Sequence, residues 1–259
     1  QMYKQLFMLS GMQNYYQIAK CYRDEDSRKD RQPEFTQLDL EILNGSPESV
    51  QKIVEDTVKF VLKNVYEQEI TEPFPKLSYN EAINKYGTDK PDLRIESTID
   101  NFTDIFKNTE ISFISKTLKD GGHVKGFVVD KILTRSEIDS LDSDVKELGS
   151  PGLGWFKIES NKVSGPLSKV ISSQENNEIA KFNNSTMLFQ AGKEREIAPI
   201  LDYLRTNLFS DKSQDGYMFV WIDNFPYFEY EDDTLQPSHH PFTSPIDTDE
   251  FINNPEEAK

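Results

Sequence analysis

The stretch Cys21–Glu41, CYRDEDSRKDRQPEFTQLDLE, decides the fold of the chain around it. An aromatic-rich arm, Tyr15–Tyr22, leads into it, and a second arm, Phe35–Ile42, alternates apolar and polar residues with a period of two. Such alternation is typical of a strand with one buried face. The charged centre between the arms is too long for a tight turn. The stretch therefore predicts two antiparallel strands joined by a long polar loop.

The polar residues near the ends of these strands suggest a ligand site. Alternation places Arg23 and Glu25 on one face of the first strand, and Phe35, Gln37 and Asp39 on one face of the second. A guanidinium can hold a phosphate or a carboxylate through two parallel hydrogen bonds. A phenyl ring can stack on a nucleobase, and a carboxylate can accept from its amine. The pattern favours a nucleotide site; the alternative is a solvated loop with surface ion pairs of ~0–1 kcal/mol each.

Three segments carry a resemblance to one known family. The order Arg23-x-Glu25, a loop, Arg31-x-x-x-Phe35 and then Asp39 resembles motif 2 of the class II aminoacyl-tRNA synthetases. The whole string from Arg23 to Glu41 is similar to that of the bacterial-type aspartyl-tRNA synthetases. Two further matches to this family follow the same order along the chain: Gln1–Leu6 (QMYKQL), and Trp221–Pro226 (WIDNFP) followed by His239–Thr243 (HHPFT).

The resemblance implies an aspartate–tRNA ligase in which no side chain acts as a nucleophile, so that positioning and charge neutralisation set the rate. Arg23 would be the catalytic residue, because it would bridge the α-carboxylate of aspartate and the α-phosphate of ATP. The residues implied in ATP binding are Arg23, Asp24, Glu25, Arg31, Gln32 and Phe35. Those implied in aspartate binding are Gln1, Lys4, Arg23, Asp39, His239 and His240.

Magnesium is expected to accompany ATP, with its protein ligands outside this chain. His239 and His240 are adjacent, and adjacent residues of a strand face opposite ways, so they are not expected to ligate one metal together. We expect no metal site within this chain. The remaining expected partners are L-aspartate, ATP and tRNA-Asp, with tRNA-Asn left open, and a homodimer at full length; no DNA and no membrane are expected.

The predicted fold class is α+β, an antiparallel class II catalytic sheet with flanking helices that is interrupted by an α+β insertion. We expect the first part of the catalytic domain over 1–107 and its continuation over 211–259. Residues 108–210 resemble the insertion module of bacterial-type aspartyl synthetases, which an amidotransferase subunit shares (a GAD-like domain). The chain is expected to be an internal part of a longer synthetase, without the anticodon-binding domain, motif 1 and motif 3, and inactive alone.

Local signals predict the individual elements. Helix starts are expected at Ser46-Pro47, at Ser78 with Glu81 and at Thr134 with Glu137, and Gly87 is expected to end the second of these helices. The apolar stripe of the helix from Ser46 to Val65 is expected to pack against the sheet as core. Further predictions are a helix within Gln1–Met12 and another over Ile197–Phe209, and strands over Val124–Val129, Trp155–Ile158 and, covered on both faces, Tyr217–Ile222.

Composition limits the function classes. The net charge of −16 argues against a general polyanion binder, so tRNA contacts must be local or lie outside this chain. Cys21 is the only cysteine, which excludes a disulfide within the chain and a cysteine-based zinc site, and we expect it in the core. No apolar run has the ~18–20 residues that span a bilayer. A bacterial cytoplasm, or an organelle, is the expected location.

Two other functions remain as alternatives. One is a non-catalytic module that binds tRNA or an amidotransferase through the insertion alone. The presence of Lys4, Arg23, Glu25, Phe35 and Asp39 together argues against it, because a binding module needs none of these five. The second alternative is an asparaginyl-tRNA synthetase, which the insertion and the lysine at position 4 disfavour.

Overall fold

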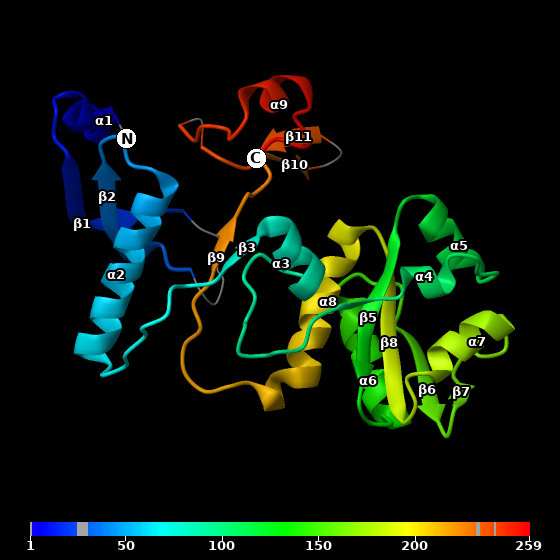
Figure 1. Cartoon of the computed structure of the whole chain (residues 1–259). Helices are drawn as coiled ribbons and strands as arrows, with labels where there is room; N and C mark the ends of the chain where they lie inside the picture. The colour runs from blue at the N-terminus through cyan, green and yellow to red at the C-terminus, as the bar shows by residue number, and fades with distance from the viewer. Residues whose placement is uncertain (1, 25–30, 232–233, 241) are drawn as a thin grey trace. The chain divides into compact units, whose positions relative to one another are not determined.

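A computed structural model describes residues 2–24, 31–231, 234–240 and 242–259. The chain forms two compact units, residues 1–74 and 75–259 (Figure 1), and each is described by itself. The predicted domain boundaries at 107 and 210 stay predictions. Gln1 and Glu25, both predicted site residues, lie outside the described residues.

The first unit is built on the predicted strand pair. Its elements in order are α1 (Met2–Leu9), β1 (Asn14–Tyr22), β2 (Glu34–Ile42) and α2 (Pro47–Val65). The two strands are antiparallel, with Cys21 opposite Phe35 and Gln17 opposite Asp39. The amide of Arg23 donates to the carbonyl of Pro33 at 2.9 Å, which extends the pairing one step beyond β1. The strand–loop–strand prediction is confirmed for the described residues.

The apolar faces of this unit are more exposed than the sequence predicts. Tyr16 and Ile18 of β1 are each 73% exposed, and Leu38, opposite Ile18, is 56% exposed. Helix α2 begins as predicted, with Ser46 accepting from the amide of Ser49 and Pro47 in the first turn. Of its residues, however, only Leu62 is buried. The prediction that its stripe packs as core is wrong within this unit.

The second unit is centred on a five-stranded antiparallel sheet of order β4-β5-β8-β6-β7. Its strands are β4 (Asp100–Asn101), β5 (His123–Val129), β6 (Gly154–Glu159), β7 (Lys162–Ser164) and β8 (Ser185–Gly192). Its helices are α3 (Tyr79–Tyr86), α4 (Thr103–Phe106), α5 (Ser112–Lys119), α6 (Arg135–Glu147), α7 (Ser173–Ala180) and α8 (Glu194–Phe209).

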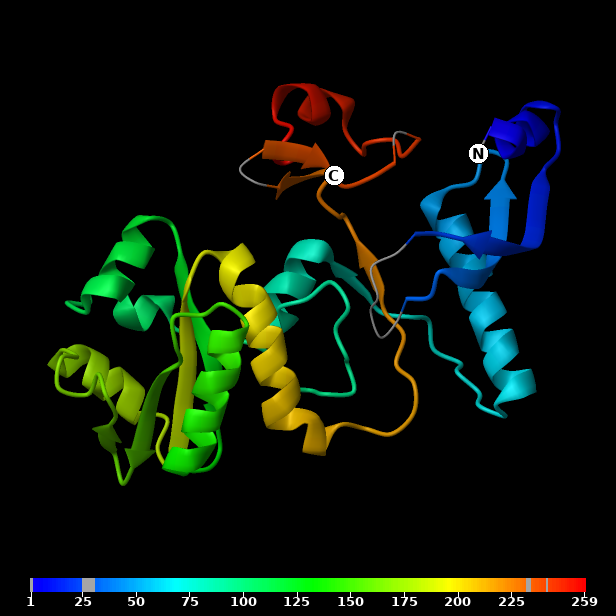
Figure 2. The ribbon, with the colours of Figure 1, turned by 180° about the vertical axis from the view of Figure 1, so that it is seen from behind.

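Helices cover both faces of this sheet, and a separate apolar core fills each side. α6 and α8 lie on one face, and α4, α5 and α7 on the other, as the two opposite views in Figures 1 and 2 show. Leu188 of β8 points into the first core, while its neighbour Phe189 points into the second. This alternation follows from the period of two in a strand, and residues 185–190 of β8 are buried on both sides of the sheet, polar side chains included.

The helix starts predicted at Ser78 and Thr134 are confirmed, whereas α8 begins three residues before the predicted Ile197. Ser78 with Glu81 and Thr134 with Glu137 form complete capping boxes at α3 and α6. Gly87 ends α3 with φ at +79°, in the left-handed region, and a Cβ there would lie 2.4 Å from the carbonyl oxygen of Ala198. Glycine is therefore needed at this position both for its backbone conformation and for the close approach of α8.

The last part of the chain differs from its prediction. The expected strand over Tyr217–Ile222 is wrong, because β9 covers only Trp221–Asp223, which pairs in parallel with β3 (Lys76–Ser78). Tyr217 is 55% exposed, so the apolar run is not covered on both faces. The chain continues through β10 (Phe228–Glu231), β11 (Thr234–Pro237) and α9 (Thr248–Asn253), after a 3-10 turn at Ser210–Lys212 has ended α8.

Candidate active site

One face of the β1–β2 hairpin gathers the predicted site residues of the first unit. Because side chains alternate along a strand, Arg23, Phe35 and Asp39 project from the same face as Gln37 and Glu41. We call this the site face. Asp39 and Phe35 are four residues apart on β2, which is ~13 Å along a strand. A ligand that contacts both ends of the site face must therefore be an extended molecule and not a small ion.

One end of the site face is an ion-pair cluster beneath α1. Lys4 Nζ lies 2.5 Å from an oxygen of Asp39 and 3.8 Å from one of Glu41. The side chains of Lys4 and Asp39 are only 22% and 20% exposed. The hydrogen bond from Lys4 to Asp39 raises the pKa of the lysine, and the charges of both carboxylates add to this effect. The ammonium group is thus held in its charged form on β2.

Helix α1 is held over this end by an aromatic contact as well as by Lys4. The ring of Phe7 stacks on that of Tyr15 with centroids 5.6 Å apart and planes inclined by 27°. Tyr15 is an odd-numbered residue of β1 and so belongs to the site face. The contact fixes α1 across the hairpin, because such ring pairs contribute ~0.5–1.5 kcal/mol beyond their buried area. α1 therefore positions Lys4.

The other end of the site face pairs Arg23 with Phe35. The guanidinium carbon of Arg23 lies 5.2 Å from the centre of the Phe35 ring, within the range of a cation–π contact. Arg23 is exposed and Phe35 is half-buried. A planar cation and an aromatic ring so close together can bind an anionic group joined to a flat ring. Asp24, Arg31 and Gln32 lie nearby in sequence and are exposed.

Sequence reasoning placed Gln37 on this face without a contact and missed Glu41. Glu41 contacts Lys4, and Gln37 accepts a hydrogen bond from the thiol of Cys21 at 3.2 Å. The period of two that gives Gln37 from Asp39 points to Glu41 as well. Cys21, predicted to be core, is only half-buried. That prediction is wrong because Cys21 faces the same side as Arg23, and not an interior.

His239 and His240 belong to the second unit, away in sequence from the hairpin. The ring of His239 lies 5.6 Å from that of Tyr227 and 6.4 Å from that of Phe225, both edge-on. His240 Nδ1 accepts from the amide of Phe242 at 3.3 Å. His239 is half-buried and His240 exposed. Their roles stay predictions.

Comparison with known proteins places the chain in a family. The family model described as class II tRNA synthetases (D, K and N) matches residues 1–259. The chain belongs to the class II tRNA synthetases. The site face therefore lies in a synthetase chain. The family resemblance of the chain is confirmed, while the part that each residue of the site face plays is a proposal.

Several curated relatives are named as aspartate–tRNA ligases. The aspartate–tRNA(Asp/Asn) ligase of Dictyoglomus turgidum is 40% identical over 259 residues, covering 96% of this chain and 44% of the relative. The aspartate–tRNA ligase of Mycoplasma capricolum is 40% identical over 255 residues, with 95% and 44% covered. That of Natranaerobius thermophilus, an aspartate–tRNA(Asp/Asn) ligase, is 37% identical over 272 residues, with 100% and 46% covered. The chain spans somewhat less than half the length of these synthetases.

Within 2–24, 31–231, 234–240 and 242–259, no three His, Cys, Asp or Glu side chains converge as a metal site would require. Among the same residues, each helix is too short or too polar to cross a bilayer.

Proposed function

We propose that this chain supplies the aspartate-binding and adenine-binding face of an aspartate–tRNA ligase. The observation that carries the proposal is the site face: a held ammonium at Lys4, with Arg23 over Phe35 ~13 Å along the strand. These two ends match the two ends of an amino acid joined to a nucleotide. The names of the relatives and the family match support the same reaction.

The proposed first step is adenylate formation. The α-carboxylate oxygen of aspartate attacks the α-phosphorus of ATP, an O–P bond forms, and pyrophosphate leaves. Arg23 binds both the carboxylate and the α-phosphate, so it neutralises the charge that develops between them. Phe35 stacks on adenine, with Glu25 accepting from the adenine amine, and Asp24, Arg31 and Gln32 contact the nucleotide. In the second step a ribose hydroxyl at the 3′ end of tRNA-Asp takes the aspartyl group and AMP leaves.

Lys4 is proposed to bind the side-chain carboxylate of aspartate. At present its ammonium is satisfied by Asp39 and Glu41. An incoming carboxylate would share this cation, while Asp39 and Gln1 bind the ammonium end of the substrate. His239 and His240 are proposed to complete the aspartate site. Magnesium would accompany ATP, but the described residues offer it no converging ligands, so we assign it none here.

The wider partners follow from the family and remain part of the proposal. Relatives from D. turgidum and N. thermophilus are named for tRNA(Asp/Asn), so tRNA-Asn is a second acceptor to test beside tRNA-Asp. The full-length protein is proposed to be a homodimer in the bacterial cytoplasm. Residues 108–210 are proposed as its α+β insertion. Neither an asparaginyl synthetase nor a binding-only module is favoured by a specific contact in the described residues.

The proposal is tested at Phe35 in a chimera, a D. turgidum ligase whose matching segment is replaced by residues 1–259. Phe35→Ala should weaken ATP binding about tenfold to a hundredfold and leave aspartate binding within about twofold, because a stacking face worth ~1–3 kcal/mol is lost. Calorimetric titration with each substrate measures both affinities. Tyr22→Ala, on the opposite face, is the matched control. Unchanged ATP affinity in a folded Phe35→Ala chimera would refute the proposed stacking.

A further inference from the structure

A pocket of about 370 Å³ lies at the start of strand β6 in the second unit, and we call it the β6-edge pocket. Strand β7 pairs with residues 157–159. Among the residues that the structure describes, the first half of β6 therefore has β8 on one side and no partner strand on the other. The loop at residues 165–167 lies there instead: a Cβ on Gly165 would be 2.7 Å from the carbonyl oxygen of Trp155. The volume is in the range of ~300–1,000 Å³ that small-ligand sites occupy.

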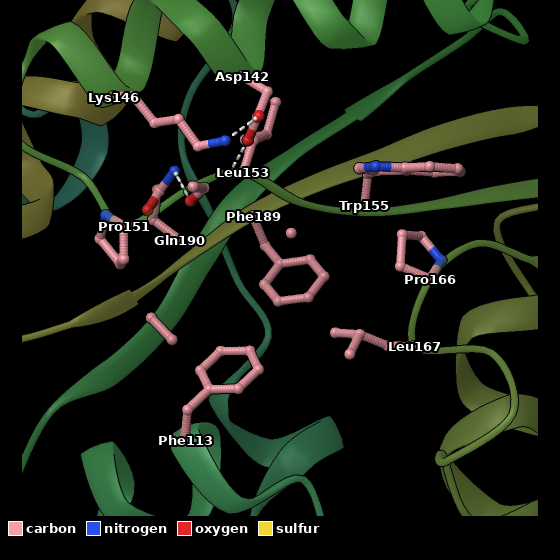
Figure 3. Close-up of a pocket in the computed structure, with 13 residues that line it drawn as sticks. Phe113, Asp142, Lys146, Pro151, Leu153, Trp155, Pro166, Leu167, Phe189 and Gln190 are labelled. Carbon is pink, nitrogen blue, oxygen red and sulfur yellow. Dashed lines mark hydrogen bonds and ion pairs between the residues drawn. The ribbon is translucent and has the colours of Figure 1, made fainter.

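Flat rings form the walls of the β6-edge pocket. Trp155 and Phe189 come from the sheet, Pro166 from the adjoining loop, and Phe113 from α5, and all four border one space in Figure 3. Phe113 is 50% exposed, which is unusual for a phenyl ring beside a packed core. A Cβ on Gly154 would lie 2.4 Å from the Phe189 ring, so glycine lets that ring lie flat along β6. Such walls suit a planar ring.

Cations lie against Trp155, one of the wall residues. The guanidinium of Arg135 is 5.4 Å from the centre of the Trp155 ring, and Lys157 Nζ is 5.7 Å from it. Neither of these two side chains lines the pocket itself; Lys146 does, and its Nζ is 2.6 Å from Asp142. Arg135 is also paired with Asp139, but within the described ranges Lys157 forms no salt bridge. A planar ring on Trp155 that carries an anion would meet the aromatic wall and these two cations together.

The charge of the surrounding module agrees with a polyanionic ligand. Residues 108–210 contain 13 Lys and Arg and 14 Asp and Glu, against 29 and 45 in the whole chain. The other 156 residues therefore hold 16 basic and 31 acidic side chains. Almost all the acidic excess lies outside this module. Of the two parts of the chain, this module repels a phosphate backbone far less.

We propose that the β6-edge pocket binds one unstacked nucleotide of a single-stranded RNA segment. The base lies among Trp155, Phe113 and Phe189, and the adjoining phosphates contact Lys157 and Arg135. Proteins commonly bind single strands in this way, with bases on aromatic side chains and the backbone along basic ones. The pocket belongs to the second unit and the hairpin to the first, and the proposed binding needs neither ATP nor aspartate. Only the identification of the RNA as tRNA rests on the proposed function.

Fluorescence titration of the 259-residue chain tests this inference. The chain has two tryptophans, so Trp221→Phe leaves Trp155 as the only reporter. An eight-nucleotide single-stranded RNA of mixed sequence should quench Trp155 saturably at 150 mM salt, and the same sequence as a duplex should not. Phe113→Ala should weaken binding about tenfold, because one stacking surface is lost. Lys157→Glu should weaken it and flatten its dependence on salt. Lys119→Glu, an exposed charge reversal on α5, should bind like the parent.

Four results would overturn the inference. The first two are no saturable quenching by the single strand and an affinity for free UMP equal to that for the octanucleotide. The others are full affinity in Phe113→Ala and Lys157→Glu once melting curves show that both fold, and saturation by a Leu- and Phe-rich octapeptide instead of RNA. The last would identify a protein-binding pocket. None of these substitutions touches the hairpin, so pyrophosphate exchange by the chimera is an independent readout. Lost RNA binding with intact exchange refutes the pocket alone, and lost exchange with intact RNA binding refutes the proposed function alone.

Discussion

The ammonium group of Lys4 is the charge that the hairpin holds most firmly. It lies between Asp39 and Glu41 with little exposure, on a helix that Phe7 fixes to the strand pair. Aspartate and asparagine have nearly the same shape and differ in charge. A fixed ammonium binds the carboxylate through a charge-assisted hydrogen bond and leaves the amide poorly matched. Lys4 is therefore the residue that we expect to separate the two amino acids.

Lys4→Met in the chimera should lower kcat/KM for aspartate steeply and kcat/KM for asparagine much less. The affinity for ATP should be nearly unchanged. A charged hydrogen bond contributes ~1.5–3 kcal/mol and an unpaired buried group costs ~1–3 kcal/mol, which together correspond to about two to four powers of ten in selectivity. Pyrophosphate exchange with each amino acid measures the ratio. Lys20→Met, 74% exposed on the opposite face, is the control. A mutant that keeps the parental preference would show that another group discriminates.

At the residue scale, the sequence predicted which side chains share a face but not all their contacts. Arg23 with Phe35 and Lys4 with Asp39 follow from strand alternation and the family resemblance, and each pair is in contact. The pairing of Glu41 with Lys4 was not predicted, although the same alternation includes it. Where α1 crosses the hairpin depends on the Phe7–Tyr15 stack, and periodicity in either element does not encode that contact.

Among the elements, α6 begins at a capping box whose acid has a strongly shifted pKa. Glu137 accepts from the amide of Thr134 at 2.6 Å and from Lys131 Nζ at 3.1 Å. Three hydrogen bonds lower the pKa of Glu137 to about 2. In order of their effect, they involve the Thr134 backbone, the Thr134 side chain and the Lys131 side chain. A carboxylate with a lowered pKa stabilises the folded state above its unfolded pKa of about 4.5, and this contribution is lost as the pH falls from there toward 2.

Glu137→Gln should therefore lower the melting temperature at pH 7 and have less effect at pH 3. Glutamine can still accept from the cap amide, so the variant removes the charge while keeping the shape of the box. Thermal unfolding of both proteins at several pH values measures the difference. A difference that stays constant from pH 7 to pH 3 would mean that the charge of Glu137 does not stabilise α6.

Helix α8 holds the segment at 92–97 through Arg205. This guanidinium is fully buried and donates to the carbonyls of Asp92 and Ile95 at 3.0 Å and of Ser97 at 3.4 Å, with its carbon 5.0 Å from the Tyr86 ring. Burial lowers its pKa, with Asp202 and Asp92 acting in the opposite direction. Arg205 therefore holds the loop of Asp92, Ile95 and Ser97 against α8.

Arg205→Met should lower the free energy of unfolding by about 3 kcal/mol or more, because one buried and two half-buried carbonyls lose their donor. Arg205→Lys should restore little of this stability, because lysine lacks the planar guanidinium group that donates several hydrogen bonds at once. Urea denaturation of the chain measures both. Arg195→Met, an exposed arginine on the same helix, should change stability by less than about 0.5 kcal/mol. Equal losses at the two positions would contradict the role given to Arg205.

Elements with strong local signals were predicted well, and those whose state depends on other segments were not. The caps at Ser46, Ser78 and Thr134 each mark a helix start, because the capping bonds are formed within four residues. The apolar stripe of α2 and the run Tyr217–Ile222 were both predicted to be covered. A pattern in one segment shows that it can be buried, and only its neighbours decide whether it is.

Across the whole molecule, charge and exposure are unevenly distributed. The acidic excess lies outside residues 108–210, whereas Tyr16, Ile18 and Leu38 expose apolar surface on the hairpin face opposite the site face. The relatives are more than twice as long as the segment they share with this chain. The chimera is therefore the setting in which the hairpin is best tested.

Aspartate-dependent exchange of pyrophosphate into ATP by the chimera, with and without Arg23, tests the central claim most directly. The parent chimera should catalyse exchange only with aspartate. Arg23→Ala should lower it about 10²–10³-fold, as the loss of one donor to developing charge does elsewhere, and Arg23→Lys should lie between. Circular dichroism confirms that each variant is folded. A folded parent chimera without exchange, or exchange that survives Arg23→Ala, would contradict the assignment of the site face to adenylate formation.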